Sequence, residues 1–331
     1  MKALVIHRHG GPEVMKLEDV PAPVVGPRDV LIDVGAAALN PLDFKVREGK
    51  LKLVTPLRFP QVLGCDVAGV VAKVGAEVTR FEVGDPVFAR LEKGRMGGLA
   101  EQVAADEAVV ARRPSSISVG EAASIPLAGL TSLQALRDVA GVTPGQRVLV
   151  HAGAGGVGSL AIQIGKHLGA HVLATASTKN LALLRELGAD EAVDYTTGDD
   201  RALHDLDVVF DTLGGASELR SLAQVRPGGV VVGVSGLPDG AFARERLPAW
   251  IRPGLWAATL RRRLAARRAK ASFRFLFMRP DGAELAELAA WIDAGHLRPL
   301  VHRTYPFAEV AEAFAELERG RARGKIVVAI R

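Results

Sequence analysis

The chain has 331 residues, of which 48% are hydrophobic, and its 42 Lys and Arg residues against 37 Asp and Glu residues give a net charge of +5. This length and hydrophobicity exclude an intrinsically disordered protein and leave room for two domains with sizeable cores. The single cysteine, Cys65, excludes an intrachain disulfide framework, and no apolar run reaches the roughly 18 residues of a membrane span. We therefore expect a cytoplasmic protein. The preference for Arg over Lys, with abundant Ala and Gly, is typical of a GC-rich bacterial genome.

Residues 1–120 predict a β-rich region. Short strand-like runs are separated by Gly, Pro and Asp clusters: KALVIH, DVLIDVGAAAL, VAGVVAKVG, DPVFARL and AEQVAA. The first of these runs indicates a strand rather than a signal peptide.

From about residue 121 the pattern changes. The stretch VGEAASIPLAGLTSLQALRDVA has helical spacing. Strands then alternate with helices, the strands being RVLVH, HVLATAS, EAVDY, DVVFDTL, GGVVVGVS and SFRFLFM. Apolar strands with helices between them predict the α/β class, with a doubly wound parallel sheet. The last 35 residues predict a helix and a terminal strand.

The loop after RVLVH is a candidate phosphate-binding turn. It contains Gly153-x-Gly155-x-x-Gly158, with a strand before it and an amphipathic helix after it. Gly153 would permit the tight turn, Gly155 would let the backbone approach a pyrophosphate, and Gly158 would allow close helix–strand packing. Gly156 and Val157 would present backbone N–H groups to the phosphates. The alternative is a glycine-rich turn that binds nothing.

The end of the next strand bears on which dinucleotide binds. NAD-binding folds place an Asp or Glu there, whereas this strand ends in Ser177, Thr178 and Lys179. Hydroxyl groups and one cation suit a 2′-phosphate, so we expect NADPH. The alternative is that these residues only cap the following helix.

Several stretches resemble a known family. ALNPLDFK, GCDVAGVVAKVGAEVTRFEVGDPVFA, PLAGLTSLQAL, GAGGVGSLAIQIGKHLGA and LRELGADEAVDY are similar to motifs of the medium-chain dehydrogenase/reductases, in their zinc-free quinone-oxidoreductase branch. Within the branch the chain looks closest to the NADPH-dependent alkenal/one oxidoreductases. The resemblance implies a GroES-like β-barrel catalytic domain of residues 1–124 and 296–331, and a Rossmann NADPH-binding domain of residues 125–295.

The resemblance also implies roles for individual residues. Asn40 would line the substrate side and donate to a carbonyl oxygen, and Thr131 would contact the nicotinamide or its ribose. Tyr195 would contact the adenosine phosphate, and the turn with Gly233, Val234 and Ser235 would reach the nicotinamide side. The alternatives are turn chemistry for Asn40 and an ordinary strand-end position for Tyr195. Asp43 is interpreted as the cap of a helix that begins at FKVREG.

The zinc-binding relatives need Cys and His-Glu ligands that this chain lacks. Asn40 stands near the first ligand position and Cys65-Asp66 where His-Glu would be, and the eight histidines have no ligand spacing. We expect no bound zinc, and we interpret Cys65 as a buried small hydrophobe.

Without a metal, the favoured chemistry is hydride transfer from NADPH to an electrophilic carbonyl or quinone, with geometry and electrostatics supplied by the protein. The alternative from another class is a non-catalytic NADPH-binding protein, crystallin-like or membrane-associated. We expect a homodimer and no nucleic-acid partner.

Residues 246–280 contain no Asp or Glu and ten cationic side chains. They could contact an anionic membrane. Alternatively they form a solvated helix followed by a strand at the dimer interface.

Overall fold

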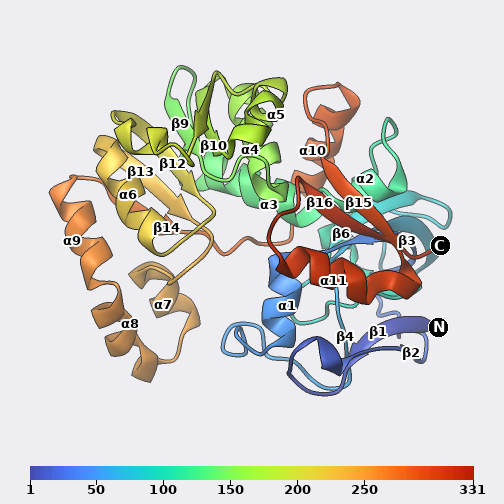
Figure 1. Ribbon diagram of the computed structural model, residues 1–331. Coiled ribbons are helices and arrows are strands. Elements are labelled where there is room, and N and C mark those ends of the chain that lie inside the picture. Colours follow the sequence, from blue (N-terminus) through green and yellow to red (C-terminus); the bar gives the residue numbers. More distant parts are fainter. The chain divides into compact units, whose positions relative to one another are not determined.

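The computed structural model describes residues 1–331, which form two compact units (Figure 1). One unit comprises residues 1–130 and 279–331, and the other comprises residues 131–278. The predicted domain boundaries at 124/125 and 295/296 stay a prediction.

The first unit is built on a seven-stranded sheet of order β15-β16-β3-β5-β6-β8, with β7 also paired to β3. The pairs are antiparallel except for β15–β16, which are parallel. The strands are β3 (Asp29–Ala38), β5 (Asp66–Val74), β6 (Pro86–Arg90), β7 (Gln102–Asp106), β8 (Val110–Arg112), β15 (Val301–Pro306) and β16 (Lys325–Ala329).

A smaller antiparallel sheet and four helices complete this unit. The sheet has the order β2-β1-β4, with β1 (Lys2–Ile6), β2 (Met15–Asp19) and β4 (Gln61–Val62). The helices are α1 (Pro41–Arg47), α2 (Val119–Ala123), α10 (Gly282–Asp293) and α11 (Val310–Glu318). Alternating apolar residues of the strands form the core, in which Ile32, Val67 and Phe314 are fully buried. The five runs predicted as strands are β1, β3, β5, β6 and β7, so that prediction is confirmed.

The second unit contains a six-stranded parallel sheet of order β11-β10-β9-β12-β13-β14. The strands are β9 (Arg147–Val150), β10 (His171–Ala176), β11 (Glu191–Asp194), β12 (Leu206–Asp211), β13 (Val225–Gly233) and β14 (Ser272–Phe275). The helices are α4 (Gly156–His167), α5 (Leu181–Glu186), α6 (Ala216–Gln224), α7 (Gly240–Arg246), α8 (Arg252–Ala258) and α9 (Leu260–Arg268). This confirms the predicted α/β class with a doubly wound parallel sheet.

The order of the strands reverses between β9 and β12, which is where such sheets bind ligands at their carboxyl ends. The predicted strand SFRFLFM is shorter than expected, since β14 ends at Phe275. Helix α3 (Pro126–Leu133) continues as a π-helical segment, Gln134–Val139. Short 3₁₀ helices lie at Pro12–Val14, Glu107–Val109, Thr178–Asn180, Asp199–Ala202, Ala249–Ile251 and Phe307–Glu309. None of the helices is both long and apolar enough to cross a membrane.

Candidate functional site

The turn between β9 and α4 is closely packed on one side and open on the other. A Cβ atom on Gly158 would lie 2.3 Å from the carbonyl oxygen of Ala152, a separation that no side chain tolerates. A Cβ atom on Gly155 would have only that oxygen near it, at 3.3 Å. Gly158 is therefore required by the packing of the chain on itself, whereas a Cβ atom at Gly155 would crowd one backbone oxygen and meet no other atom within 4 Å.

The positive backbone angle of this turn falls on a different residue from the one expected. Ala152 has a φ of 52°, while Gly153 has no positive φ. Gly153 is small for another reason, because a Cβ atom there would lie 2.7 Å from Leu184 Cδ2. The tight turn is thus made at Ala152, and Gly153 provides room for the core.

The N-terminus of α4 has no side-chain cap. The first N–H groups of a helix have no carbonyl partner within the helix. Here these are the backbone N–H groups of Gly156, Val157 and Gly158, and no side chain caps them. Ser132 on α3 fixes this turn by donating to the carbonyl oxygen of Val157 at 3.0 Å. Free N–H groups and the positive end of the helix dipole together suit a phosphate group.

The adjacent ends of β10 and β11 bring the predicted 2′-phosphate residues together. Ala176 and Asp194 are register partners, so Ser177 and Lys179 lie near Tyr195, whose side chain is 55% exposed. The Ser177 hydroxyl does not cap the helix. It accepts a hydrogen bond from the side chain of Asn180 at 3.3 Å.

Asp194 is a carboxylate that the sequence analysis missed at this place. It accepts hydrogen bonds from the Thr178 hydroxyl at 2.5 Å and from the N–H and hydroxyl of Thr196 at 2.8 and 2.6 Å. These bonds, that of Thr178 foremost, lower the pKa of Asp194. The Thr178 hydroxyl is therefore committed to Asp194, which leaves Ser177, Lys179 and Tyr195 as the candidate phosphate contacts.

The loops after β12 and β13 approach each other through their backbones. Gly214 and Gly236 both have positive φ, and a Cβ atom on Gly214 would lie 3.0 Å from the Gly236 nitrogen. Of the predicted residues, Gly233 is the last residue of β13, and Val234 and Ser235 belong to the loop that follows it. Gly233 is packed against Phe273, whose ring would lie 2.7 Å from a Cβ atom.

A buried chain of hydrogen bonds joins the carboxyl ends of these strands. The two ring nitrogens of His151 lie 3.2 Å from the hydroxyls of Thr175 and Ser221, and Ser221 donates to Asp211 at 2.9 Å. Burial lowers the pKa of His151, which favours the neutral ring. A neutral His151 ring accepts a hydrogen bond from Thr175 and donates one to Ser221, which donates to Asp211. All three hydrogen bonds therefore run in the same direction, from Thr175 to Asp211. This role of His151 was not recognisable from the sequence, because its partners come from three separate elements.

In the first unit, Asn40 is 2% exposed and its side chain is engaged on all sides. Its amide nitrogen donates to Asp66 Oδ2 at 3.0 Å, and its oxygen accepts from the ammonium of Lys325, which also lies 3.3 Å from Asp66. Asp66 further accepts the backbone N–H of Leu127 at 3.0 Å. Lys325, at the start of β16, is the residue of this cluster that the sequence analysis missed.

The prediction that Asp43 is the N-cap of a helix beginning at FKVREG is wrong. The helix α1 begins at Pro41, a residue type favoured at the first helical position, and Asn40 is its N-cap. Asp43 is the third residue of the helix and accepts the Asn40 backbone N–H at 2.7 Å. Its carboxylate also accepts from the Cys65 thiol at 3.4 Å. The carboxylate thus closes the first turn of α1 from inside the core.

Burial governs the protonation of this cluster. It raises the pKa of Asp43 to about 6, with the nearby Asp66 charge adding to the effect. Burial also raises the pKa of the Cys65 thiol well above its usual value, so Cys65 is a buried thiol and not a thiolate nucleophile. Within residues 1–331, no group of three or more His, Cys, Asp or Glu side chains is arranged to hold a metal ion. Thr131, the other predicted catalytic residue, lies in α3 and is 5% exposed.

The geometry agrees with comparisons to known proteins. Residues 26–115 match the alcohol dehydrogenase GroES-like domain, and residues 187–328 match the model described as zinc-binding dehydrogenase. The NADPH-dependent alkenal/one oxidoreductase of Arabidopsis thaliana chloroplasts is 39% identical, over 99% of this chain and 79% of the relative. The mitochondrial NAD(P)H oxidoreductase RTN4IP1 of Mus musculus is 34% identical, over 99% of this chain and 89% of the relative.

Among solved structures, the quinone oxidoreductase of Coxiella burnetii is 33% identical, with a TM-score of 0.85, and covers 100% of this chain and 99% of its own. The parallel sheet of the second unit has the strand order of a dinucleotide-binding fold, and residues 26–115 match a GroES-like domain. A chain with both is a dehydrogenase/reductase. The chain belongs to the medium-chain dehydrogenase/reductase superfamily, in its quinone-oxidoreductase branch.

The two loop glycines can be told apart by experiment. Gly158→Ala should lower the free energy of unfolding by about 1–3 kcal/mol, because the new methyl group meets backbone that cannot move aside. Gly155→Ala should stay within about 1 kcal/mol of the wild type but bind NADPH more weakly, because its methyl group occupies open space over the turn. Denaturant unfolding and a calorimetric titration with NADPH measure the two effects. Equal NADPH affinity in Gly155→Ala and the wild type would contradict the assignment of this space to a ligand.

Asp43→Asn should change how stability depends on pH. Because the folded-state pKa of about 6 lies above the ordinary 3.8, folding favours the protonated acid, and this contribution is lost as the pH rises through 6. The asparagine keeps an acceptor for the Asn40 N–H and carries no charge. Relative to the wild type, the variant should therefore gain up to about 3 kcal/mol between a pH near 3.8 and a pH well above 6. A difference in unfolding free energy that does not vary with pH would show that folding leaves the pKa of Asp43 unchanged, and would contradict the raised pKa.

Proposed function

We propose that the protein is a zinc-independent reductase that transfers hydride from NADPH to a quinone or an α,β-unsaturated carbonyl compound. The observation that carries the proposal is the uncapped N-terminus of α4 beside the open face of Gly155. The end-to-end similarity to relatives named as NAD(P)H oxidoreductases supports the same class of reaction. No observation favours the alternative of a non-catalytic NADPH-binding protein.

The residues of the turn suit the cofactor. The N–H groups of Gly156, Val157 and Gly158 would hold the pyrophosphate. Ser177, Lys179 and Tyr195 would hold the 2′-phosphate, and the loop at Gly233, Val234 and Ser235 would support the nicotinamide side. When bound, NADPH supplies a hydride, which is the reductant of the reaction.

The electrophile accepts this hydride with its two electrons. In an enal or enone, the hydride adds to the β-carbon, the carbonyl oxygen becomes an enolate, and a proton from water then adds to the α-carbon. In a quinone, the hydride and one proton from water give the hydroquinone. We assign no side chain as the proton donor.

The contacts of Asn40 support a positioning role in this reaction. Its amide hydrogens are directed to Asp66, Ala38 and Cys65, and its oxygen is held by Lys325, so the side chain has no free donor for a substrate. Asn40, Cys65 and Asp66 stand where the metal-dependent relatives have their zinc ligands. In this chain the ammonium group of Lys325 contacts Asn40 and Asp66. This supports chemistry in which the protein contributes fixed charge and no metal. The role of Thr131 at the nicotinamide stays a prediction.

The remaining parts of the proposal concern assembly and location. The homodimer stays a prediction. A cytoplasmic location and a peripheral membrane contact through residues 246–280 stay predictions, as does the absence of a nucleic-acid partner.

Cofactor preference and substrate class can be tested in one assay. A panel of quinones and enals is offered with NADPH or NADH, and the loss of reduced nicotinamide is followed by absorbance. The wild type should turn over at least one class and prefer NADPH. Lys179→Ala should raise the KM for NADPH about tenfold or more and leave that for NADH nearly unchanged, because it removes a charge-assisted contact of roughly 1.5–3 kcal/mol.

Ser177→Asp should shift the preference toward NADH, because the carboxylate repels a 2′-phosphate and accepts from a 2′-hydroxyl. Arg201→Gln, which removes an exposed charge elsewhere in the same unit, is the control. An unchanged NADPH/NADH ratio of kcat/KM in Ser177→Asp would mean that the cluster does not bind the phosphate. No turnover of any quinone or enal would contradict the proposed reaction itself.

A further inference from the structure

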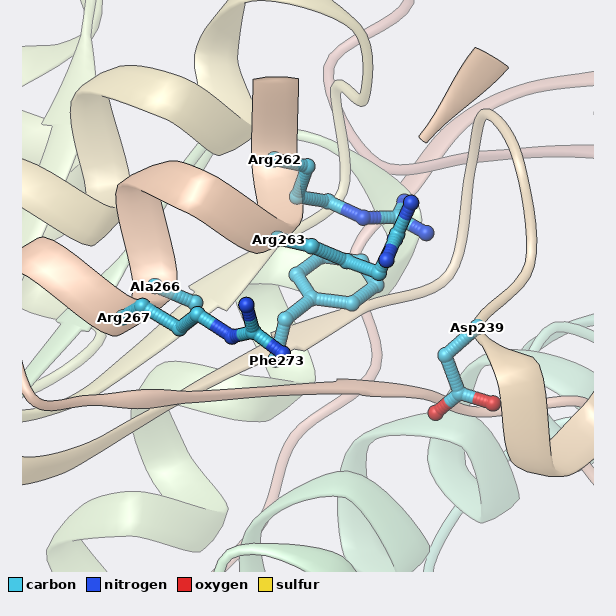
Figure 2. Close-up of a pocket in the computed structure, with 6 residues that line it drawn as sticks. All are labelled: Asp239, Arg262, Arg263, Ala266, Arg267 and Phe273. Atoms are coloured by element: carbon cyan, nitrogen blue, oxygen red, sulfur yellow. The ribbon is translucent and has the colours of Figure 1, made fainter. Parts of the chain in front are cut away.

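The second unit has a surface pocket between α9 and β14, the edge strand of its sheet. Its volume is about 210 Å³, and its lining comes from the loop after β13, from α9 and from β14. Figure 2 shows three arginine side chains gathered around one aromatic ring, with a single carboxylate opposite them. The lining residues are Asp239, Arg262, Arg263, Ala266, Arg267 and Phe273.

Arg262 is a fixed part of the wall. It is nearly buried and forms an ion pair with Glu218 at 2.8 Å. It also donates to the carbonyl oxygens of Leu237 and Pro238 at 2.6 and 2.8 Å, and its guanidinium lies 3.9 Å from the centre of the Phe273 ring. Its charge is therefore paired, and three of its five N–H donors are used.

Asp239 is also committed. One of its oxygens accepts the backbone N–H of Phe242 at 2.8 Å, which caps α7, and the other accepts the backbone N–H of Phe275 at 3.0 Å. The only carboxylate of the pocket thus holds two backbone segments and pairs with none of the three arginines.

Arg263 and Arg267 remain without a carboxylate partner. Arg263 donates one bond, to the carbonyl oxygen of Trp256 at 2.8 Å, and stacks on that indole at 4.0 Å, while its buried Nε has no hydrogen-bond partner. The exposed side chain of Arg267 follows one helical turn later, on the same face of α9. Two like charges at this spacing repel each other, and an anion between them would remove the repulsion.

The residues around Arg263 and Arg267 indicate which kind of anion could bind between them. Between residues 246 and 280 there is no Asp or Glu, so no carboxylate of that segment competes for the two guanidiniums. Guanidinium groups bind phosphate oxygens through paired hydrogen bonds. Trp256, on which Arg263 stacks, is 61% exposed, and Trp250 of the same acid-free segment is 77% exposed. Large exposed indoles in a cationic segment are typical of protein surfaces that meet lipid headgroups.

We propose that Arg263 and Arg267 form a phosphate-binding site on α9, separate from the glycine turn and suited to a phosphate monoester anion. Such an anion can be the headgroup of an anionic lipid or a free phosphate, and the exposed indoles favour the lipid. The site lies at the β14 edge of the sheet, whereas the candidate 2′-phosphate residues follow β10 and β11 near the opposite edge.

The test uses two probes on the full chain. Cosedimentation is measured with vesicles of phosphatidylcholine, with and without phosphatidic acid, and inorganic phosphate is titrated by calorimetry. The wild type should sediment with the phosphatidic acid vesicles only. Arg263→Gln/Arg267→Gln should bind roughly tenfold more weakly or worse, because two charge-assisted contacts are lost. Arg185→Gln/Arg201→Gln removes the same charge from exposed positions of the same unit and should bind nearly as the wild type does.

Binding of inorganic phosphate that depends on the same two arginines, without vesicle binding, would support the site and assign it to a free phosphate. If the glutamine variant is unstable to heat, Arg263→Lys/Arg267→Lys takes its place. The lysines keep both charges but lack the paired donors, so binding should still weaken several-fold. Equal losses in the test and control variants would mean unspecific charge attraction and would overturn the proposal. Absence of binding of both probes by the wild type would also overturn it.

Discussion

The close approach of the backbone between β9 and α4 is the constraint on which the second unit depends. Gly158 lies against the carbonyl of Ala152, which directs the first turn of α4 away from the strand and leaves its N–H groups unpaired. The hydrogen-bonded chain from Thr175 through His151 to Asp211 ties the ends of β10, β9 and β12 together next to this turn. A phosphate site made of backbone needs such a rigid frame, because its donors cannot be reoriented by a change of rotamer.

The first unit is organised around a buried charge cluster. Two carboxylates, Asp43 and Asp66, lie near one ammonium group, that of Lys325, with Asn40 between them. Removing such charges from water is costly, so each must be offset by hydrogen bonds. The backbone N–H groups of Asn40 and Leu127 and the ammonium of Lys325 do this. The cluster thereby joins α1, β5 and β16, which are far apart in the sequence, and fixes the side chain of Asn40.

The sequence was most informative where the signal is local. The position of the glycine motif between a strand and a helix, and the alternation of strands and helices, are recognised within about 30 residues, and the structure confirms both. Contacts between distant segments could not be predicted in this way. Lys325 is 285 residues from Asn40, and Asp194 meets Thr178 only because β10 and β11 pair in register. The strand β15 was missed because its exposed residues, HRT, show no apolar pattern.

The central claim is that hydride passes from NADPH to the β-carbon of an electrophilic carbonyl compound without a metal. The most direct measurement uses NADPH labelled with deuterium at C4 of the nicotinamide, an enal as acceptor, and a zinc chelator in a parallel reaction. The account predicts a saturated aldehyde that carries the label on its β-carbon, formed at the same rate with and without the chelator. An allylic alcohol labelled at the carbonyl carbon, or a reaction abolished by the chelator, would contradict it.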